Sequence, residues 1–256
     1  MEPKPQGSEE MKLTFLGTRG EIEIRSRRHG RHSALRVEQD DARITIDCGK
    51  DWLHRVRAIA PTAIVLTHAH DDHAAGLIRG APCPVYATAA TWKVLHRLSI
   101  LDRRNMPLRR AVRIGGARFS AFPVMHSLRA PAAGYRVSSQ QRSCFYLPDV
   151  AELPNPTSTL RRIDLYIGNG ATIRHSMVRR KGSALVGHAP IIHQLDWCTK
   201  AHVRHAVFTH CGSPIVRASA QAVDSLIGRL GKERGIEAWI ASDGDHLSLR
   251  PAIRRN

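Results

Sequence analysis

The feature that most constrains this chain is a cluster of metal-binding side chains directly after a short apolar stretch. The stretch, Ala63–Leu66, has the length and composition of a buried strand. The next seven residues contain His68, His70, Asp72 and His73. Two residues apart in an extended segment, His68 and His70 point to the same side. Asp72 and His73 follow where the chain turns toward a helix, so the pattern predicts two adjacent metal ions at a strand end.

Three further residues of ligand type follow other apolar stretches. They are His126, Asp149 and His210, and each comes at most two positions after a predicted strand. Loops at strand ends are where a rigid scaffold presents ligands. We therefore expect these three side chains to join the histidine cluster in one site.

Strand-like and helix-like stretches alternate along most of the chain. The predicted strands are Lys12–Leu16, Ser33–Val37, Ala42–Asp47, Ala63–Leu66, Val112–Ile114, Ala117–Val124, Gly134–Val137, Cys144–Leu147, Asp164–Ile167, Ala206–Thr209 and Ala238–Ile240. Helical spacing links Trp52, Val56 and Ile59, and again Val223, Leu226, Ile227 and Leu230. This order predicts a layered α/β fold. We expect one domain over residues 11–250, between a disordered tail at 1–10 and a basic tail at 251–256.

The order of these residues resembles the metallo-β-lactamase superfamily. The shared pattern is Thr-His-x-His-x-Asp-His after a strand, followed by a later His, an Asp and a final His. The resemblance implies a four-layer αββα sandwich. It also implies the following roles: His68, His70 and His126 hold one metal, Asp72, His73 and His210 hold the second, Asp149 bridges them, and Asp47 supports the ligands.

Within that superfamily, the chain is most similar to the ribonuclease Z and cyclic-phosphodiesterase branch. His126-Ser127 followed by Gly134-Tyr135-Arg136-Val137 resembles one signature of the branch, and Leu185–Pro190 resembles the segment that bears a histidine outside the ligand set. The likeness implies that His188 acts on the leaving group or on a phosphate oxygen. The sequence departs from the branch in having no long Gly/Pro-rich insertion of the kind that grips tRNA.

The predicted chemistry is hydrolysis by a hydroxide shared between two divalent ions. Imidazole and carboxylate ligands favour zinc, with manganese and iron as alternatives. A phosphodiester has a poor leaving group that needs a proton, which His188 can supply. We expect His188 and Asp72 to be the catalytic residues, Asp72 being a ligand as well. The alternative is a hydrolase of lactones, esters or thioesters, which a pocket without phosphate-binding arginine would favour. A third hypothesis is a metal-bound binding or regulatory module without turnover. The intact set of ligands argues against it.

Charge and cysteine content bear on partners and location. Lys and Arg number 39 against 22 Asp and Glu, for a net charge of +17. This excess suits a small phosphodiester or short nucleic acid as substrate, but scattered surface arginines would account for it equally well. The arginine-rich segment 19–36 has no assigned role. Five cysteines without a Cys-x-x-Cys pair, and no apolar run of membrane length, predict a cytoplasmic protein that does not enter a membrane. A homodimer remains an open alternative.

Overall fold

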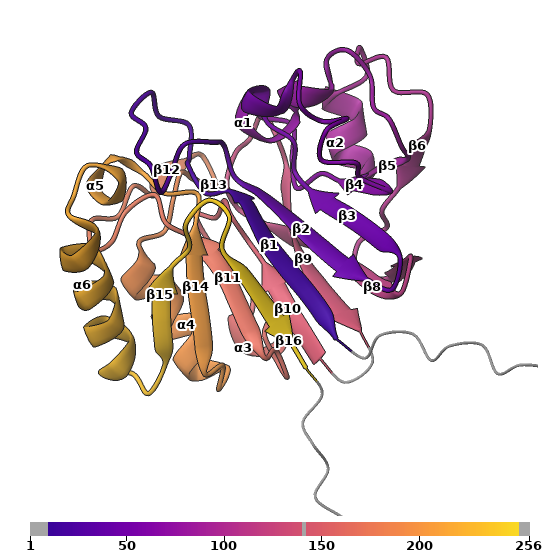
Figure 1. Ribbon diagram of the computed structural model, residues 1–256. Coiled ribbons are helices and arrows are strands. Elements are labelled where there is room, and N and C mark those ends of the chain that lie inside the picture. The colour runs from indigo at the N-terminus through magenta and orange to yellow at the C-terminus, as the bar shows by residue number, and fades with distance from the viewer. Residues whose placement is uncertain (1–9, 140–141, 251–256) are drawn as a thin grey trace, which may run out of the picture.

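The computed structural model describes residues 10–139 and 142–250 and arranges them in four layers (Figure 1). Within these residues two seven-stranded sheets pack face to face, and helices cover the outer face of each. The predicted αββα sandwich is therefore confirmed. The two predicted tails lie outside the described residues, except for Glu10, whose carboxylate accepts a hydrogen bond from Arg250.

The first sheet has the strand order β16-β1-β2-β3-β4-β5-β6. Its strands are β1 (Met11–Gly17), β2 (Ala34–Gln39), β3 (Ala42–Ile46), β4 (Ala63–Val65), β5 (Val85–Ala87), β6 (Arg103–Asn105) and β16 (His246–Leu249). β2 and β3 form the predicted antiparallel hairpin. β3, β4, β5 and β6 run parallel. Their carboxyl ends therefore meet at one edge, which is where β4 delivers the histidine cluster.

The second sheet has the strand order β15-β14-β11-β10-β9-β8-β7. Its strands are β7 (Ala111–Ile114), β8 (Ala117–Val124), β9 (Ala132–Ser139), β10 (Arg142–Tyr146), β11 (Leu165–Asn169), β14 (His205–Thr209) and β15 (Glu237–Ile240). β10, β11, β14 and β15 are parallel, and β9 is antiparallel to both β8 and β10. β8, β10 and β14 therefore end on the same side, and each leads to one of the remaining candidate ligands.

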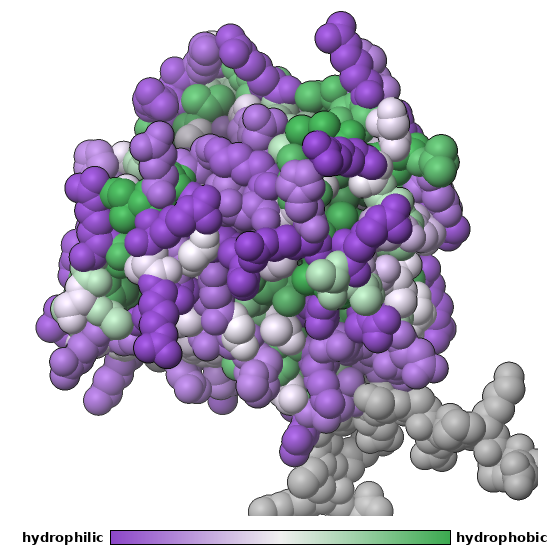
Figure 2. Space-filling view, turned by 45° about the horizontal axis from the view of Figure 1, so that its top comes forward, coloured by the Kyte–Doolittle hydropathy of each residue, from purple (hydrophilic) through white to green (hydrophobic). Residues whose placement is uncertain are grey.

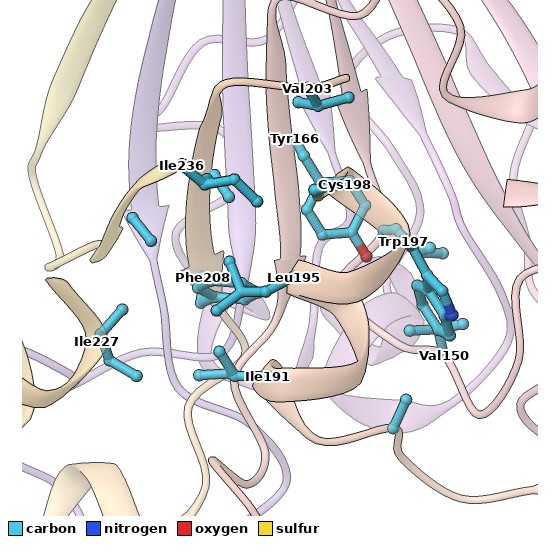
Figure 3. Close-up of a cluster of buried hydrophobic side chains, with 14 of the residues drawn as sticks. Val150, Tyr166, Ile191, Leu195, Trp197, Cys198, Val203, Phe208, Ile227 and Ile236 are labelled. Atoms are coloured by element: carbon cyan, nitrogen blue, oxygen red, sulfur yellow. The ribbon is translucent and has the colours of Figure 1, made fainter. Parts of the chain in front are cut away.

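Short helices close the two outer layers. α1 (Asp71–Ala74), α2 (Ala89–Val94) and the 3-10 turns η1 (Lys50–Trp52) and η2 (Ala75–Leu77) belong to the first sheet's side. α3 (Pro156–Thr159), α4 (Ile191–Lys200), α5 (Ser213–Val216) and α6 (Ala220–Lys232) belong to the second sheet's side. Figure 3 shows part of this second core, where Leu195 of α4 lies against Phe208 of β14. No helix in the described part of the chain is long and apolar enough to cross a membrane.

Two predicted elements differ from the structure. The helical spacing of Trp52, Val56 and Ile59 corresponds to η1 followed by turns over residues 53–59, and the chain leaves helical geometry at Ala60, whose φ is +43°. The last strand is β16, which pairs antiparallel with β1, and not the predicted strand at 238–240. A small hairpin of β12 (Arg179–Lys181) and β13 (Ala184–Val186) was also not predicted.

Candidate metal centre

β4 and the start of α1 place the histidine cluster at the carboxyl edge of the first sheet. His68 is fully buried just beyond the strand. His70 is the N-cap of α1 and keeps an extended backbone, so the chain turns into the helix only after it. Asp72 and His73 then lie buried within α1. This sharp change of direction brings both pairs of side chains to one place.

The structure brings all seven predicted ligands together. Their ligand atoms form two groups, each with all atoms within 4.8 Å of one another: the first is His68, His70, His126 and Asp149, and the second is Asp72, His73, Asp149 and His210. Asp149 belongs to both groups. The division is the one that the resemblance implied. Whether the residues bind metal stays a prediction.

Asp149 contacts both groups through its two carboxylate oxygens. Oδ2 lies 2.8 Å from Nε2 of His73 and 3.4 Å from Nε2 of His68. Oδ1 lies 3.2 Å from Nδ1 of His210 and 3.1 Å from Nδ1 of His188. One buried carboxylate thus lies between the two groups, the position that a bridging ligand requires.

The chemistry of these atoms fits divalent cations. Among the described residues, Nε2 of His73, Oδ1 of Asp149 and Nδ1 of His210 are buried and have no well-aligned hydrogen bond. Buried polar atoms normally have a partner, and several that converge without one call for an explanation. Imidazole nitrogens and carboxylate oxygens are ligands for zinc and for manganese or iron. The residues present therefore fit the two ions that the sequence predicts.

The two groups differ in charge. Burial lowers the pKa of His68, and it lowers the pKa of His126 to about 4, so both imidazoles are neutral. Burial alone would raise the pKa of Asp149, but the histidines around it hold that pKa well below its usual range. Burial alone would lower the pKa of His73 and His210, but neighbouring carboxylates raise both. The first group therefore offers mainly neutral imidazole nitrogens, whereas the second contains two carboxylates, those of Asp72 and Asp149.

Asp47 supports the ligands from behind. It is fully buried directly after β3. Its Oδ1 accepts hydrogen bonds from the Thr67 amide at 2.8 Å and the Thr67 hydroxyl at 3.0 Å. Its Oδ2 lies 2.8 Å from Nδ1 of His73. The chain then passes close to α1 at Gly49, where only glycine fits, because a Cβ there would lie 1.9 Å from the carbonyl oxygen of Asp72. Asp47 therefore sets the ring of His73 so that Nε2 faces the second group.

Replacing Asp47 by asparagine is expected to weaken metal binding by about 10- to 100-fold while the fold persists. The amide keeps the size of the carboxylate but loses the charge that orients the His73 ring. Competition with a metallochromic chelator measures the affinity, and thermal denaturation checks the fold. The matched control is Asp164→Asn, because Asp164 also accepts a backbone amide, that of Ser143, but is no part of either group. Equal metal affinity of the Asp47 variant and the parent would contradict this supporting role.

The arginine-rich segment 19–36 supplies a loop that packs against the second group. The amide of Cys211 donates to Thr18 O at 2.7 Å, and the amide of Gly20 donates to Cys211 O at 3.0 Å. Gly20 lies against the imidazole of His210, where a Cβ would come within 3.1 Å of the ring. This loop therefore fixes the backbone that carries His210. The sequence did not predict this role.

One arginine of this loop is buried. Arg19 has 1% relative exposure. Its Nη2 donates to Oδ2 of Asp51 at 2.6 Å and lies 3.0 Å from Nε2 of His32. Asp51 also accepts the backbone amide of His32 at 2.9 Å. Arg19, Asp51 and His32 thus anchor the loop. No motif separates Arg19 from the other arginines, so a sequence pattern could not find it.

A pocket of about 540 Å³ opens beside the two groups. It is lined by Glu21, Ala69, His70, Asp71, Asp72, His126, Asp149, His188 and His210. Among the described residues that line it there is no lysine or arginine, despite the chain's net charge of +17. A bound substrate would therefore meet imidazoles and carboxylates before any cationic side chain.

His188 lies in this pocket but in neither group of candidate ligands. Its ring is stacked on that of His210 at 5.6 Å and meets that of His126 edge-on at 5.1 Å. The side chain keeps 20% exposure. It is therefore accessible to a substrate while held against the ligand histidines. The resemblance implied a histidine outside the ligand set at this position.

Comparison with known proteins agrees with the fold. The sequence model of the β-lactamase superfamily domain matches residues 42–211. The chain is 29% identical to ribonuclease Z of Methanopyrus kandleri over 147 residues, which are 51% of each chain. It is 28% identical to ribonuclease Z of Crocosphaera subtropica over 159 residues, 52% of this chain and 49% of that protein. The chain thus spans about half the length of the curated relatives it matches.

Solved structures share the architecture over nearly the whole chain. The metallo-β-lactamase fold protein YhfI from Bacillus subtilis has a TM-score of 0.71 at 16% identity, covering 94% of this chain and 99% of that one. A diphosphatase from the PhnP family has a TM-score of 0.70 at 20% identity, covering 94% and 97%. The short form of human tRNase Z has a TM-score of 0.63 at 18% identity, covering 94% and 100%. At these identities the likeness shows the fold.

Proposed function

Because this chain belongs to the β-lactamase superfamily, we propose that it is a hydrolase that depends on two divalent metal ions and cleaves phosphodiesters. The observation that carries the proposal is the place of His188. It lies in the pocket, 3.1 Å from Asp149, without being part of either ligand group. A histidine there can donate a proton to a departing alkoxide, which a phosphodiester needs.

The proposed ligand assignment follows the two groups of side chains. His68, His70 and His126 would hold one ion, Asp72, His73 and His210 would hold the other, and Asp149 would lie between them. When bound, the two ions supply Lewis acidity that activates water and stabilises negative charge on the phosphoryl group.

The protein's own groups orient and move protons around this centre. The attacking water loses a proton to solvent as it forms its bond to phosphorus within the pocket, where the carboxylate of Asp72 can accept a hydrogen bond from it. The bond from phosphorus to the leaving oxygen breaks on the opposite side. His188, in its protonated form, donates a proton to that oxygen, and the alcohol departs. Asp47 holds the ring of His73 throughout, because its carboxylate fixes Nδ1.

The relatives support a phosphodiester as substrate. Both curated proteins described above carry the name ribonuclease Z. One similar structure is a diphosphatase and another is a tRNase Z. The sequence matches cover about half of the curated proteins, so the activity of the whole relative is a proposal for this chain.

One observation favours a second candidate. The described lining of the pocket contains no arginine or lysine to hold a phosphate. An acyl group, as in a lactone, ester or thioester, would need no such cation. In the phosphodiesterase proposal the two ions supply the positive charge instead, and that function also gives His188 a role.

A substrate panel on metal-loaded protein tests the choice. Elemental analysis is expected to give two divalent ions per chain, as the two ligand groups require. The loaded protein is then offered bis-p-nitrophenyl phosphate, cyclic nucleotides, a lactone and a thioester at equal concentration. We expect turnover of the phosphodiesters, with none after dialysis against a chelator and recovery when metal is restored. A stoichiometry that never exceeds one ion would reject the two-metal proposal, and lactone or thioester turnover alone would select the second candidate.

Three finer points remain predictions from the sequence. Zinc is the favoured ion, with manganese or iron as alternatives. A cytoplasmic location fits the five cysteines, all of which are free thiols. A homodimer is the third point, and size measurement in solution decides it.

A further inference from the structure

A hairpin beside the pocket concentrates positive charge that the proposed chemistry does not use. β12 and β13 pair antiparallel across Gly182-Ser183, and the positive φ of Gly182, +63°, suits so tight a turn. We call residues 174–186 the basic hairpin. From Leu165 to Leu195 the sequence contains no aspartate or glutamate. Its arginine and lysine residues over this stretch are Arg174, Arg179, Arg180 and Lys181.

These four side chains are exposed. Unlike Arg19 or Arg28, none of them has a carboxylate partner among the described residues. An exposed cation without a partner keeps its full charge available to an anion from solution. The basic hairpin is therefore a local positive site at the surface.

The basic hairpin is tied to two residues that line the pocket, His126 and His188. Within the hairpin, the amide of Met177 donates to His188 O at 3.2 Å. Directly after it, the amide of Gly187 donates to His126 O at 2.9 Å. β12, β13 and α1 lie at the same end of the molecule (Figure 1). Turning that end forward shows a surface that is mostly hydrophilic (Figure 2). A chain that enters the pocket past His188 would thus run beside the basic hairpin.

The distribution of charge indicates the substrate. The pocket offers a phosphoryl group no lysine or arginine among its described lining residues, and Glu21 and Asp71 at its wall are acidic. A substrate with a single phosphate would leave the cations of the basic hairpin unused. A substrate with several phosphates would place one at the metal centre and the next ones against the hairpin.

We propose that the basic hairpin binds phosphates next to the scissile bond, and that the substrate is accordingly a single-stranded oligonucleotide rather than a cyclic mononucleotide. This inference rests on the proposed phosphodiesterase function and names its substrate class. Each phosphate that a cationic side chain neutralises on a single strand contributes about 0.7 to the slope of log affinity against log salt. Contacts with Arg179, Arg180 and Lys181 would together contribute about 2.

The test is the triple variant Arg179→Gln, Arg180→Gln, Lys181→Gln, which removes three charges from exposed positions. On metal-loaded protein, kcat/KM for a short single-stranded RNA or DNA is expected to fall at least about tenfold. The slope of log kcat/KM against log salt concentration is expected to become less negative by about 2. Hydrolysis of bis-p-nitrophenyl phosphate, which has one phosphate, should stay within about twofold. Fluorescence anisotropy with a cleavage-resistant phosphorothioate oligonucleotide measures binding independently of turnover.

The matched control removes the same charge elsewhere. Arg113 and Arg118 are exposed residues of the β7–β8 hairpin, and Arg110 is an exposed residue directly before it. Replacing all three by glutamine should leave oligonucleotide binding nearly unchanged. Equal loss in both triple variants, or no loss in the basic-hairpin variant, would overturn the proposal. If the parent protein cleaves no phosphodiester, anisotropy still decides: binding that depends on the basic hairpin supports the site while the proposed function fails.

Discussion

Replacing Asp149 by alanine is expected to release at least one of the two proposed metal ions and to abolish nearly all of the proposed hydrolysis. Asp149 is buried and belongs to both ligand groups, with Oδ2 at 2.8 Å from His73 and Oδ1 at 3.2 Å from His210. No other residue joins the groups, within the part of the chain described here. Loss of a side chain that only orients a metal ligand already lowers metal affinity or activity by about 10- to 100-fold. Loss of the shared ligand should therefore cost more than about 100-fold in kcat/KM.

Metal content and rate must be measured on the same preparation. Elemental analysis after gel filtration gives the stoichiometry, and bis-p-nitrophenyl phosphate gives the rate. Asp196→Ala is the matched control, because it removes a carboxylate that pairs with Arg234 at the surface, away from both groups. Asp149→Ala protein with two ions and a normal rate would show that the carboxylate does not bridge.

The candidate ligands could be predicted because each lies next to a local signal. A buried strand precedes His68, and other strands precede His126, Asp149 and His210. Parallel strands with their carboxyl ends at one edge then bring the side chains together. The grouping into two sets came from the resemblance, and the distances in the structure match it.

The loop over His210 could not be predicted, because its contacts join residues far apart in sequence. Arg19 pairs with Asp51, 32 positions away, and the hydroxyl of Thr18 donates to Asp243, 225 positions away. Periodicity and spacing report only neighbours along the chain. The same argument covers His32, whose role depends on Asp51 and Arg19.

Short strands escaped prediction for a related reason. β5, β6, β12 and β13 have three residues each, too few to establish alternation. All residues of β6 and β12 are exposed, and most of them are basic, a pattern typical of a loop. β16 has only Leu247 and Leu249 as apolar residues, and its place depends on pairing with β1 at the other end of the chain. Such strands form because a partner is available.

Replacing His188 by alanine is expected to slow substrates with poor leaving groups far more than activated ones. If His188 donates a proton to the departing alkoxide, its loss should cost about 100- to 10,000-fold on a dinucleotide or cyclic nucleotide. p-Nitrophenolate departs without a proton, so its esters should keep most of their rate. The measurement is kcat/KM for both classes of substrate, with metal content checked, since the His188 ring lies against His126 and His210.

Comparing the two substrate classes distinguishes a proton donor from a residue that only maintains the shape of the pocket. His193→Ala is the matched control, because His193 is an exposed histidine of α4 outside the pocket lining, and its loss should not change the ratio between the two substrate classes. An equal loss on both classes in His188→Ala would assign His188 to binding or support. Only the proton-donor assignment makes the loss in His188→Ala depend on the basicity of the leaving oxygen. A graded series of aryl and alkyl esters should therefore give a steeper dependence in the variant than in the parent, because the parent's proton donor compensates for a basic leaving group.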